Sequence, residues 1–194
     1  TNHLVGKKIA STIDDAAGEA FDKGASMLGL PYPGGPALAK LASTGGRDVW
    51  KFPSPLQGGQ KHQMSFSGLK TSLKYLLRDL GEKSSSEEVR ADIAASYEDA
   101  IVQHLCSRVD YALHQHPDIR ELHIVGGVSA NARLREVAQD IAMNHGVNLR
   151  SPSILRYCTD NAAMIAAAGF VCRKHAKPWI TLATLPLETI LTSQ

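Results

Sequence analysis

The apolar residues of this chain recur mainly at helical spacing, most regularly in its middle third. One stripe there advances by about four residues at each step and consists of Val89, Ile93, Tyr97, Ile101, Leu105 and Val109. Such a stripe is typical of a helix that buries one face. The run SSSEE at residues 84–88 has the composition of a capping box, which opens a helix, and Pro117 ends it. The pattern therefore predicts one long helix between these two signals.

Two shorter helices are predicted near the start of the chain. Asp14 and Asp15 stand where an N-cap belongs, and the helix that follows them ends at Gly29. The turn LPYPGGP comes next. Pro36 then fits the first position of a second helix, which stops at the glycines at 45 and 46.

The next segment changes from turns back to a helix. Residues 47–66 are rich in turn-forming residues and show no periodicity, so they predict a long ordered loop or a lid. The stretch SFSGLKTSLKYLLRDLG at residues 65–81 carries leucines at helical spacing and predicts a helix. If Ser67 is the N-cap of this helix, capping explains much of the composition of SFSGLKT.

Strand patterns are fewer and shorter. Residues 3–13 alternate loosely and contain β-branched side chains, so they predict a strand. A second strand at residues 121–128 leads through a glycine-rich turn into a helix at residues 130–146 and a short strand at residues 147–153. This β–turn–α–β unit is the clearest indication of an α/β fold. A last helix is expected from about Asp160 to His175.

The composition is that of an ordinary globular protein, with 43% hydrophobic and 21% charged residues in 194. The 21 lysines and arginines nearly balance 19 acids, which argues against a protein that coats a polyanion but leaves room for a local basic face. No apolar run approaches the roughly 20 residues of a membrane span. Cys106, Cys158 and Cys172 form no CxxC pair and are too few for a disulfide framework, so a reducing compartment is expected.

The turn GGVSAN at residues 126–131 is the first candidate for ligand binding. A strand that runs through Gly126 and Gly127 into a helix presents free backbone N–H groups, and the missing side chains let a ligand approach closely. Asn131 in the first turn of that helix could hydrogen-bond a sugar or a phosphate. The same pattern also fits a tight turn that Ser129 caps, because it is neither a Walker motif nor GxGxxG.

Three carboxylates on the first predicted helix are the second candidate. Asp15, Glu19 and Asp22 share one helix face, and alanine and glycine fill the positions between them, as if something packs closely there. The turn PGG supplies a flexible backbone nearby, and Lys23 is expected to point elsewhere. A solvated acidic face explains the same spacing.

Asp160 is the third candidate. It lies in the run TDN, whose residue types are all preferred at an N-cap, so capping explains the pattern. A metal site would need partner ligands, and the eight histidines include no HxxxH pair. HExxH, the zinc-protease signature, is also missing. Cys158 has no histidine nearby in the sequence and is expected to be an inert thiol.

Four segments in order carry more information together than they do singly: STIDDAAGEAFDKGASMLGLPYPGGPALAKLA, SFSGLKT, GGVSANARLR and YCTDNAAMIAAAG. They resemble the successive motifs of the tRNA N6-adenosine threonylcarbamoyltransferase family, formerly labelled O-sialoglycoprotein endopeptidases. SGLKT is similar to the bacterial and mitochondrial branch. The resemblance covers nearly the entire chain.

The resemblance implies a two-lobed fold of the ASKHA type (actin-like ATPase, ribonuclease H-like) with the ligand between the lobes. Residues 1–194 are then one α/β domain, most of the C-terminal-side lobe with a large helical insertion, and the N-terminal lobe is absent. The implied reaction transfers a threonylcarbamoyl group from threonylcarbamoyl-AMP to N6 of the adenosine next to the tRNA anticodon. One divalent metal ion per subunit, iron or zinc, is the implied cofactor.

The resemblance also implies roles for individual residues. Asp22 in FDK resembles the family's aspartate on the nucleotide sugar, and Gly35 in PYPGG resembles its backbone neighbour on the same ligand. Asn131 in SAN is similar to the asparagine that binds the substrate from the other side, next to Gly126 and Gly127. Asp160 in CTDN resembles a ligand of the active-site metal, whose other ligands are expected outside this chain.

The sequence departs from the family pattern in three respects. Ala162 replaces the glycine that usually follows TDN, and Gln63 replaces an acid that commonly precedes SFSGLKT. The HxxxH pair that supplies two metal ligands in the family is missing, and the chain begins at Thr1 rather than Met. We therefore expect a second-lobe fragment, shortened by design, by proteolysis or in its gene, that has no transferase activity alone.

Two functions compete at this point: a lobe of an enzyme, and a non-catalytic nucleotide-binding or dimerisation module. The expected partners are threonylcarbamoyl-AMP, tRNA, the missing N-terminal lobe, and a second copy or a paralogous ASKHA-fold protein, with no membrane. A truncated sheet edge near residues 3–13 favours strand pairing between copies. The expected compartment is the cytoplasm, with the mitochondrial matrix as the alternative.

Overall fold

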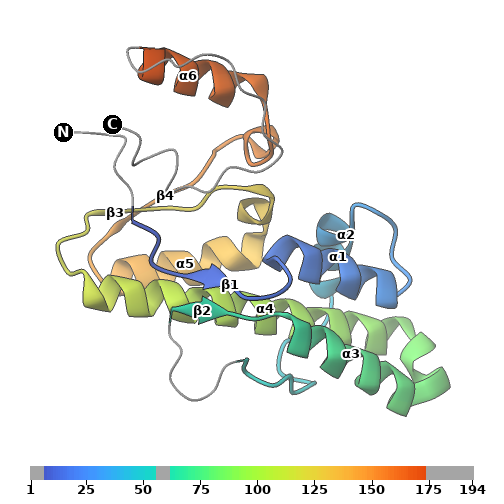
Figure 1. Cartoon of the computed structure of the whole chain (residues 1–194). Coiled ribbons are helices and arrows are strands. Elements are labelled where there is room, and N and C mark those ends of the chain that lie inside the picture. The colour runs from blue at the N-terminus through green and yellow to red at the C-terminus, as the bar shows by residue number, and fades with distance from the viewer. Residues whose placement is uncertain (1–6, 56–61, 174–194) are drawn as a thin grey trace.

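One long helix, α4 (Glu87–Gln115), runs through the centre of the protein (Figure 1). The computed structural model describes residues 7–55 and 62–173. Helices α1 (Ala17–Met27), α2 (Gly34–Ala42), α3 (Ser67–Leu80) and α5 (Ala132–Asn144) all contact α4. The prediction of a long central helix is confirmed. The predicted capping box is not formed within the described residues, since Ser86 takes the N-cap position without a side-chain capping bond.

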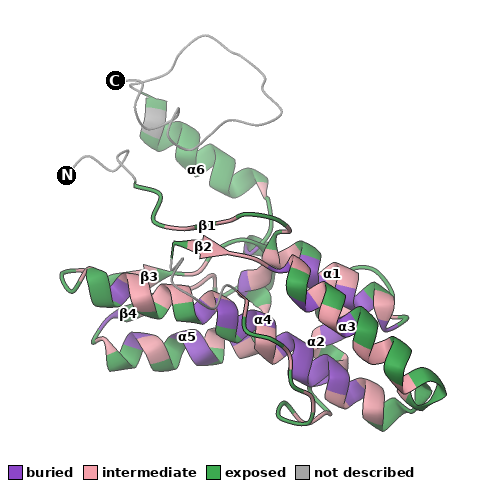
Figure 2. Ribbon diagram, turned by 60° about the horizontal axis from the view of Figure 1, so that its bottom comes forward, coloured by how far each residue is buried: buried purple, intermediate pink, exposed green. Residues whose placement is uncertain are grey.

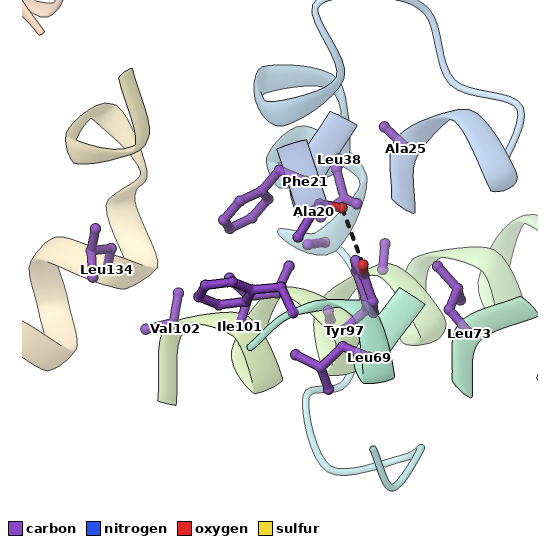
Figure 3. Close-up of a cluster of buried hydrophobic side chains, with 14 of the residues drawn as sticks. Ala20, Phe21, Ala25, Leu38, Leu69, Leu73, Tyr97, Ile101, Val102 and Leu134 are labelled. Atoms are coloured by element: carbon purple, nitrogen blue, oxygen red, sulfur yellow. Dashed lines mark hydrogen bonds between the residues drawn. The ribbon is translucent and has the colours of Figure 1, made fainter. Parts of the chain in front are cut away.

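The core lies where the four helices meet α4 (Figure 3). Ile93, Tyr97 and Ile101 of the predicted stripe are completely buried, whereas Val89 and Leu105 are only partly buried. α4 is buried on more than the predicted side, because helices pack around it, and His104 and Cys106 are therefore also inside. A one-faced pattern underestimates the burial of a helix at the centre of a bundle.

α1 and α2 pack closely because glycine allows it. A Cβ atom at Gly34 would lie 2.7 Å from Cα of Asp22. In the same way Gly24 lets α1 pack on α4, because a Cβ atom there would overlap the Tyr97 ring. α2 begins at Gly34 rather than at the predicted Pro36, directly after a cis peptide bond between Tyr32 and Pro33.

The N-terminal strand is much shorter than predicted. β1 (Ser11–Thr12) pairs in parallel with β2 (Gln63–Met64), and residues 7–10 are not in a strand. Residues 3–6 of the predicted strand lie outside the described residues. β2 belongs to a segment predicted as a loop, so the prediction for residues 47–66 is wrong at its end. In the described part of residues 3–13, strand structure forms only at Ser11–Thr12, where β2 supplies hydrogen bonds.

The predicted β–turn–α–β unit is confirmed. β3 (Glu121–His123) leads through the 3-10 turn η2 (Gly127–Ala130) into α5, and β4 (Asn148–Arg150) returns parallel to β3 with Leu122 opposite Leu149. Both strands are shorter than the sequence predicts. The described part of the chain is thus a mixed helix and strand fold in which helices predominate.

The last described helix stands apart from the core (Figures 1 and 2). A 3-10 turn, η3 (Leu155–Tyr157), leads into α6 (Ala162–Cys172), two residues later than the predicted start, and His175 lies outside the described residues. Residues 162–171 are all exposed although they are mostly apolar. A further 3-10 turn, η1 (Gly81–Ser85), links α3 to α4. Among the described helices, none is both long enough and apolar enough to cross a membrane.

Candidate functional site

The turn after β3 is built around Asn131. Its Oδ1 accepts a hydrogen bond from Leu134 N at 2.8 Å and caps α5, while its Nδ2 donates to Glu98 Oε1 at 2.7 Å. The predicted cap, Ser129, is instead buried, and its hydroxyl has no hydrogen-bond partner among the described residues. The prediction was wrong because η2 extends the turn and moves the start of α5 to Ala132.

Gly126 and Gly127 differ in backbone conformation. Gly126 has φ +87°, a left-handed conformation that favours glycine, so the backbone alone explains it. Gly127 has no such conformation, and a Cβ atom there would meet nothing within 4 Å in the described structure. Both glycines therefore border open space, which is the arrangement that close approach of a ligand needs.

Asp22 and Gly35, two predicted substrate residues far apart in the sequence, are brought together. Asp22 Oδ1 accepts a hydrogen bond from Gly35 N at 3.1 Å, at the N-terminus of α2. The carboxylate thus satisfies one of the free N–H groups with which every helix begins. No hydrogen bond to Asp22 Oδ2 occurs among the described residues, so this oxygen is available to a ligand.

The three carboxylates predicted to share one helix face do not act as one acidic face, and Asp15 lies before α1. Asp15 binds Lys70 at 2.7 Å and Lys23 at 3.2 Å, and Lys23 also binds Glu19. The hydrogen bond from Lys70 lowers the pKa of Asp15, and contacts with Glu19 and then Asp15 raise the pKa of Lys23. Lys23 therefore lies between two of the acids, contrary to the prediction that it points elsewhere. Asp22 remains separate from this ion-pair cluster.

Asp14 has a role that sequence reasoning missed. Its Oδ1 accepts a hydrogen bond from Phe66 N at 2.8 Å, and its Oδ2 accepts from the hydroxyls of Ser65 and Ser67. Burial alone would raise the pKa of Asp14, but these hydrogen bonds lower it to about 2. Asp14 therefore caps α3, and Ser67 is not its N-cap. No local signal could reveal a cap 52 positions away in the sequence.

The two candidate ligand segments border each other. A Cβ atom at Gly18 would lie 3.5 Å from Cγ2 of Val128, so the start of α1 approaches η2 closely. Asp22 lies four residues after Gly18 and therefore on the same face of α1. Tyr97 of α4 holds α1 in this place, because its hydroxyl donates to Ala20 O at 3.1 Å (Figure 3).

Asp160 is not brought into this group by any hydrogen bond or ion pair of the described residues. Asn161, rather than Asp160, caps α6, since its Oδ1 accepts from Met164 N at 2.9 Å. Asp160 is exposed directly before that cap. Among the described residues, no cluster of three or more His, Cys, Asp or Glu side chains could hold a metal. Asp160 thus offers a single carboxylate.

Arg135 connects the segment before Asp160 to the glycine turn. Its guanidinium donates to the carbonyls of Ser129 and Pro152 and to Cys158 Sγ at 3.4 Å. Cys158 is buried by this arrangement and is a free thiol. The sequence predicts an inert thiol at Cys158, and the structure shows this thiol accepting a hydrogen bond from Arg135.

A cavity of about 370 Å³ lies elsewhere, between α4 and residues 47–55. Its walls include Arg47, Trp50, Phe52 and Gln103, and none of the predicted site residues. The candidate site thus lies outside this cavity, where Gly126 and Gly127 border open space in the described structure.

Comparison with known proteins defines the class. The model of the tRNA N6-adenosine threonylcarbamoyltransferase family matches residues 2–167. A transferase of that name from Gluconobacter oxydans is 45% identical over 174 residues, which cover 87% of this chain and 47% of the relative. The relatives from Magnetococcus marinus (85% of this chain, 46% of the relative) and Thermosipho africanus (92% and 53%) are 48% and 40% identical.

The chain is an α/β protein, and the matched residues 2–167 include every candidate ligand segment described above. It belongs to the tRNA N6-adenosine threonylcarbamoyltransferase family, as the resemblance predicted. The chain spans about half the length of the curated relatives it matches.

Proposed function

We propose that this chain is most of the C-terminal-side lobe of a two-lobed ASKHA-fold enzyme that modifies tRNA. The reaction is the transfer of a threonylcarbamoyl group from threonylcarbamoyl-AMP to N6 of the adenosine next to the anticodon. Membership of the family over residues 2–167 is the observation that carries the proposal. The adjacent positions of the Asp22–Gly35 pair and the Gly126–Asn131 turn support it.

The residues of this chain bind and orient the adenylate. Asp22 Oδ2 accepts from a ribose hydroxyl next to the backbone of Gly35, and the free N–H of Asn131 Nδ2 donates to the same ligand from the other side. The backbone of Gly126 and Gly127 lies against it, because no side chain intervenes. Two bordering segments thus fix the donor while its carbonyl carbon is attacked.

Asp160 is the residue of this chain that would hold the metal. Its exposed carboxylate, free of hydrogen bonds within the described part of the chain, fits one position in the coordination of iron or zinc. The bound ion would polarise the carbamoyl carbonyl, which compensates for the weak nucleophilicity of an adenine N6. The mixed anhydride already contains a good leaving group, so no serine or cysteine nucleophile is needed.

The isolated chain is expected to be inactive. It has no HxxxH pair, and one carboxylate cannot hold a catalytic metal with useful affinity. We test the reaction with a chimera that joins the remaining half of the Gluconobacter oxydans relative to this chain. Threonylcarbamoyl-AMP and unmodified tRNA are supplied, and the modified nucleoside is measured by mass spectrometry of digested tRNA.

The expected result is modified tRNA with the chimera and none with the 194-residue chain. An Asp160→Asn chimera is the matched control, and it should lose activity without loss of thermal stability because Asp160 makes no described contact. An inactive chimera that folds and binds the adenylate would instead support the competing function, a non-catalytic nucleotide-binding or dimerisation module. Activity of the chain alone would overturn the fragment proposal.

The proposed cellular compartment and binding partners follow from the same proposed enzyme. Cys106 and Cys158 are buried free thiols, which suits a reducing compartment, and we place the protein in the cytoplasm with the mitochondrial matrix as the alternative. Its proposed partners are tRNA, the lobe that completes the enzyme, and a second copy or a paralogous ASKHA-fold protein.

A further inference from the structure

Glu98 is a buried carboxyl group directly behind the candidate site. It lies on α4 with only 5% of its surface exposed, and its Oε1 accepts the hydrogen bond from Asn131. Burial raises the pKa of Glu98, and the hydrogen bond from Asn131 opposes that rise. Glutamate is rarely buried to this degree unless a partner compensates the loss of water. Asn131 is its hydrogen-bond partner, and the positive charges of Arg47 and Arg133 also favour the carboxylate.

The amide group of Asn131 is held at both ends. Oδ1 faces the N–H of Leu134, which donates to it, and Nδ2 faces the carboxylate of Glu98, which accepts from it. The reversed amide would set oxygen against oxygen and N–H against N–H at the two ends. Leu134 and Glu98 together therefore exclude the reversed orientation, and Glu98 is the group that holds Nδ2. One N–H of Nδ2 remains for a ligand.

We propose that Glu98 is the positioning residue for Asn131, and that its carboxylate directs the free N–H of Nδ2 to an acceptor oxygen of the adenylate. This inference rests on the proposed function, in which Asn131 binds threonylcarbamoyl-AMP. Glu98 itself does not touch the substrate. It acts through Asn131, to which its carboxylate is hydrogen-bonded from α4.

The neighbouring residue supplies a matched control. Asp99 binds Arg133 at 2.7 Å and so also joins α4 to the first turn of α5. Asp99 makes no hydrogen bond to Asn131 in the described structure. A general loosening between α4 and α5 would follow from losing either acid, whereas misorientation of Asn131 would follow only from losing Glu98.

The first experiment uses the 194-residue chain and needs no activity. The side-chain amide signals of Asn131 are compared by NMR in the unaltered chain and in Glu98→Gln, Glu98→Leu and Asp99→Asn. Gln retains an acceptor oxygen and should preserve the signals. Leu should move them toward the values of a solvent-exposed asparagine, and Asp99→Asn should leave them in place. Glu98→Met, with an unbranched stem, is the second apolar variant if Leu prevents folding.

The second experiment measures KM and kcat for threonylcarbamoyl-AMP in the chimera. An apolar residue at 98 should raise KM about tenfold, the equivalent of about one lost hydrogen bond, with kcat within about twofold. Glu98→Gln and Asp99→Asn should both stay within about twofold of the unaltered KM. If Glu98 only stabilised the packing of α4 on α5, KM would not be normal in both Glu98→Gln and Asp99→Asn while it rises in the apolar variants.

Two results would overturn the inference: unchanged Asn131 signals in the apolar variants, or an Asp99→Asn effect on KM as large as theirs. An unaltered chimera that transfers nothing would refute the proposed function instead. The NMR comparison would still decide whether Glu98 positions Asn131, so the two failures are distinguishable.

Discussion

His104 is a histidine that the fold keeps neutral. Its exposed fraction is 3%, its Nε2 accepts a hydrogen bond from Ser65 N at 3.2 Å, and its Nδ1 has no partner among the described residues. An acceptor role for Nε2 places the proton on Nδ1. Burial, and then the charge of Arg108, lower the pKa of His104 from 6.5 to about 4.

This pKa predicts a loss of stability in mild acid. Between pH 6.5 and about 4 the unfolded chain binds a proton at His104 that the folded chain does not. The contribution is therefore complete above pH 6.5 and is lost as the pH falls toward 4, by about 3 kcal/mol in total. In His104→Gln, which can still accept from Ser65, the free energy of unfolding should fall less steeply over this range.

Urea unfolding at a series of pH values measures the slope. The control is His114→Gln, because His114 is exposed on α4 and its side chain forms no hydrogen bond or ion pair among the described residues. That variant should keep the slope of the unaltered chain. Equal slopes in all three proteins would show that His104 is protonated as readily in the folded state as in the unfolded one.

At the scale of elements, Arg135 joins three segments that are not adjacent in sequence. It binds the carbonyl of Ser129 in η2, the carbonyl of Pro152 after β4, and the thiol of Cys158. Replacement of Arg135 by Met keeps the apolar stem and removes all three bonds. We expect the segment before Asp160 to open more often, because each lost bond is worth about 1 kcal/mol.

Hydrogen exchange measures this opening. The amides of Tyr157 and Cys158 form turn hydrogen bonds to Ile154 and Leu155, so they report on the segment. They should exchange at least about tenfold faster in Arg135→Met, because the loss of even two of the three bonds is worth more than about 1.4 kcal/mol. Arg120→Met is the control, since among the described residues the guanidinium of Arg120 donates only to carbonyls of its own turn. Unchanged exchange rates at both amides would show that Arg135 does not anchor the segment before Asp160.

The elements also show what the sequence could and could not predict. Helices were predictable because 3.6-residue periodicity is local, and α4 and α5 form where it predicts them, whereas β3 and β4 are shorter than predicted. The caps that join distant segments were not predictable. Asp14 precedes α1 but caps α3. Asp22 lies within α1 but caps α2. Sequence motifs name Asn131 as a candidate ligand residue, whereas Glu98 behind it becomes a candidate only through the packing of α4 on α5.

At the scale of the whole molecule, α6 is the element that the described structure leaves without a partner. A helix that is apolar on all sides is normally buried. Here the exposed fractions of Ile165 and Phe170 are 64% and 67%, and no described element covers them (Figure 2). The sequence had suggested the strand at residues 3–13 as the place where copies associate. Its described part is a two-residue strand that β2 already pairs.

We therefore expect the 194-residue chain to associate through α6. Exposed apolar surface of this kind gains free energy by leaving water, so the fraction of dimer or larger species should increase with concentration. Ile165→Glu with Phe170→Glu should shift the chain toward monomer in sedimentation velocity. Met143→Glu is the matched control, because Met143 is also an exposed apolar residue (61%) but lies on α5, and it should leave the distribution unchanged. An unaltered chain that remains monomeric at high concentration would contradict this expectation, and a shift caused equally by Met143→Glu would assign the association to added charge rather than to α6.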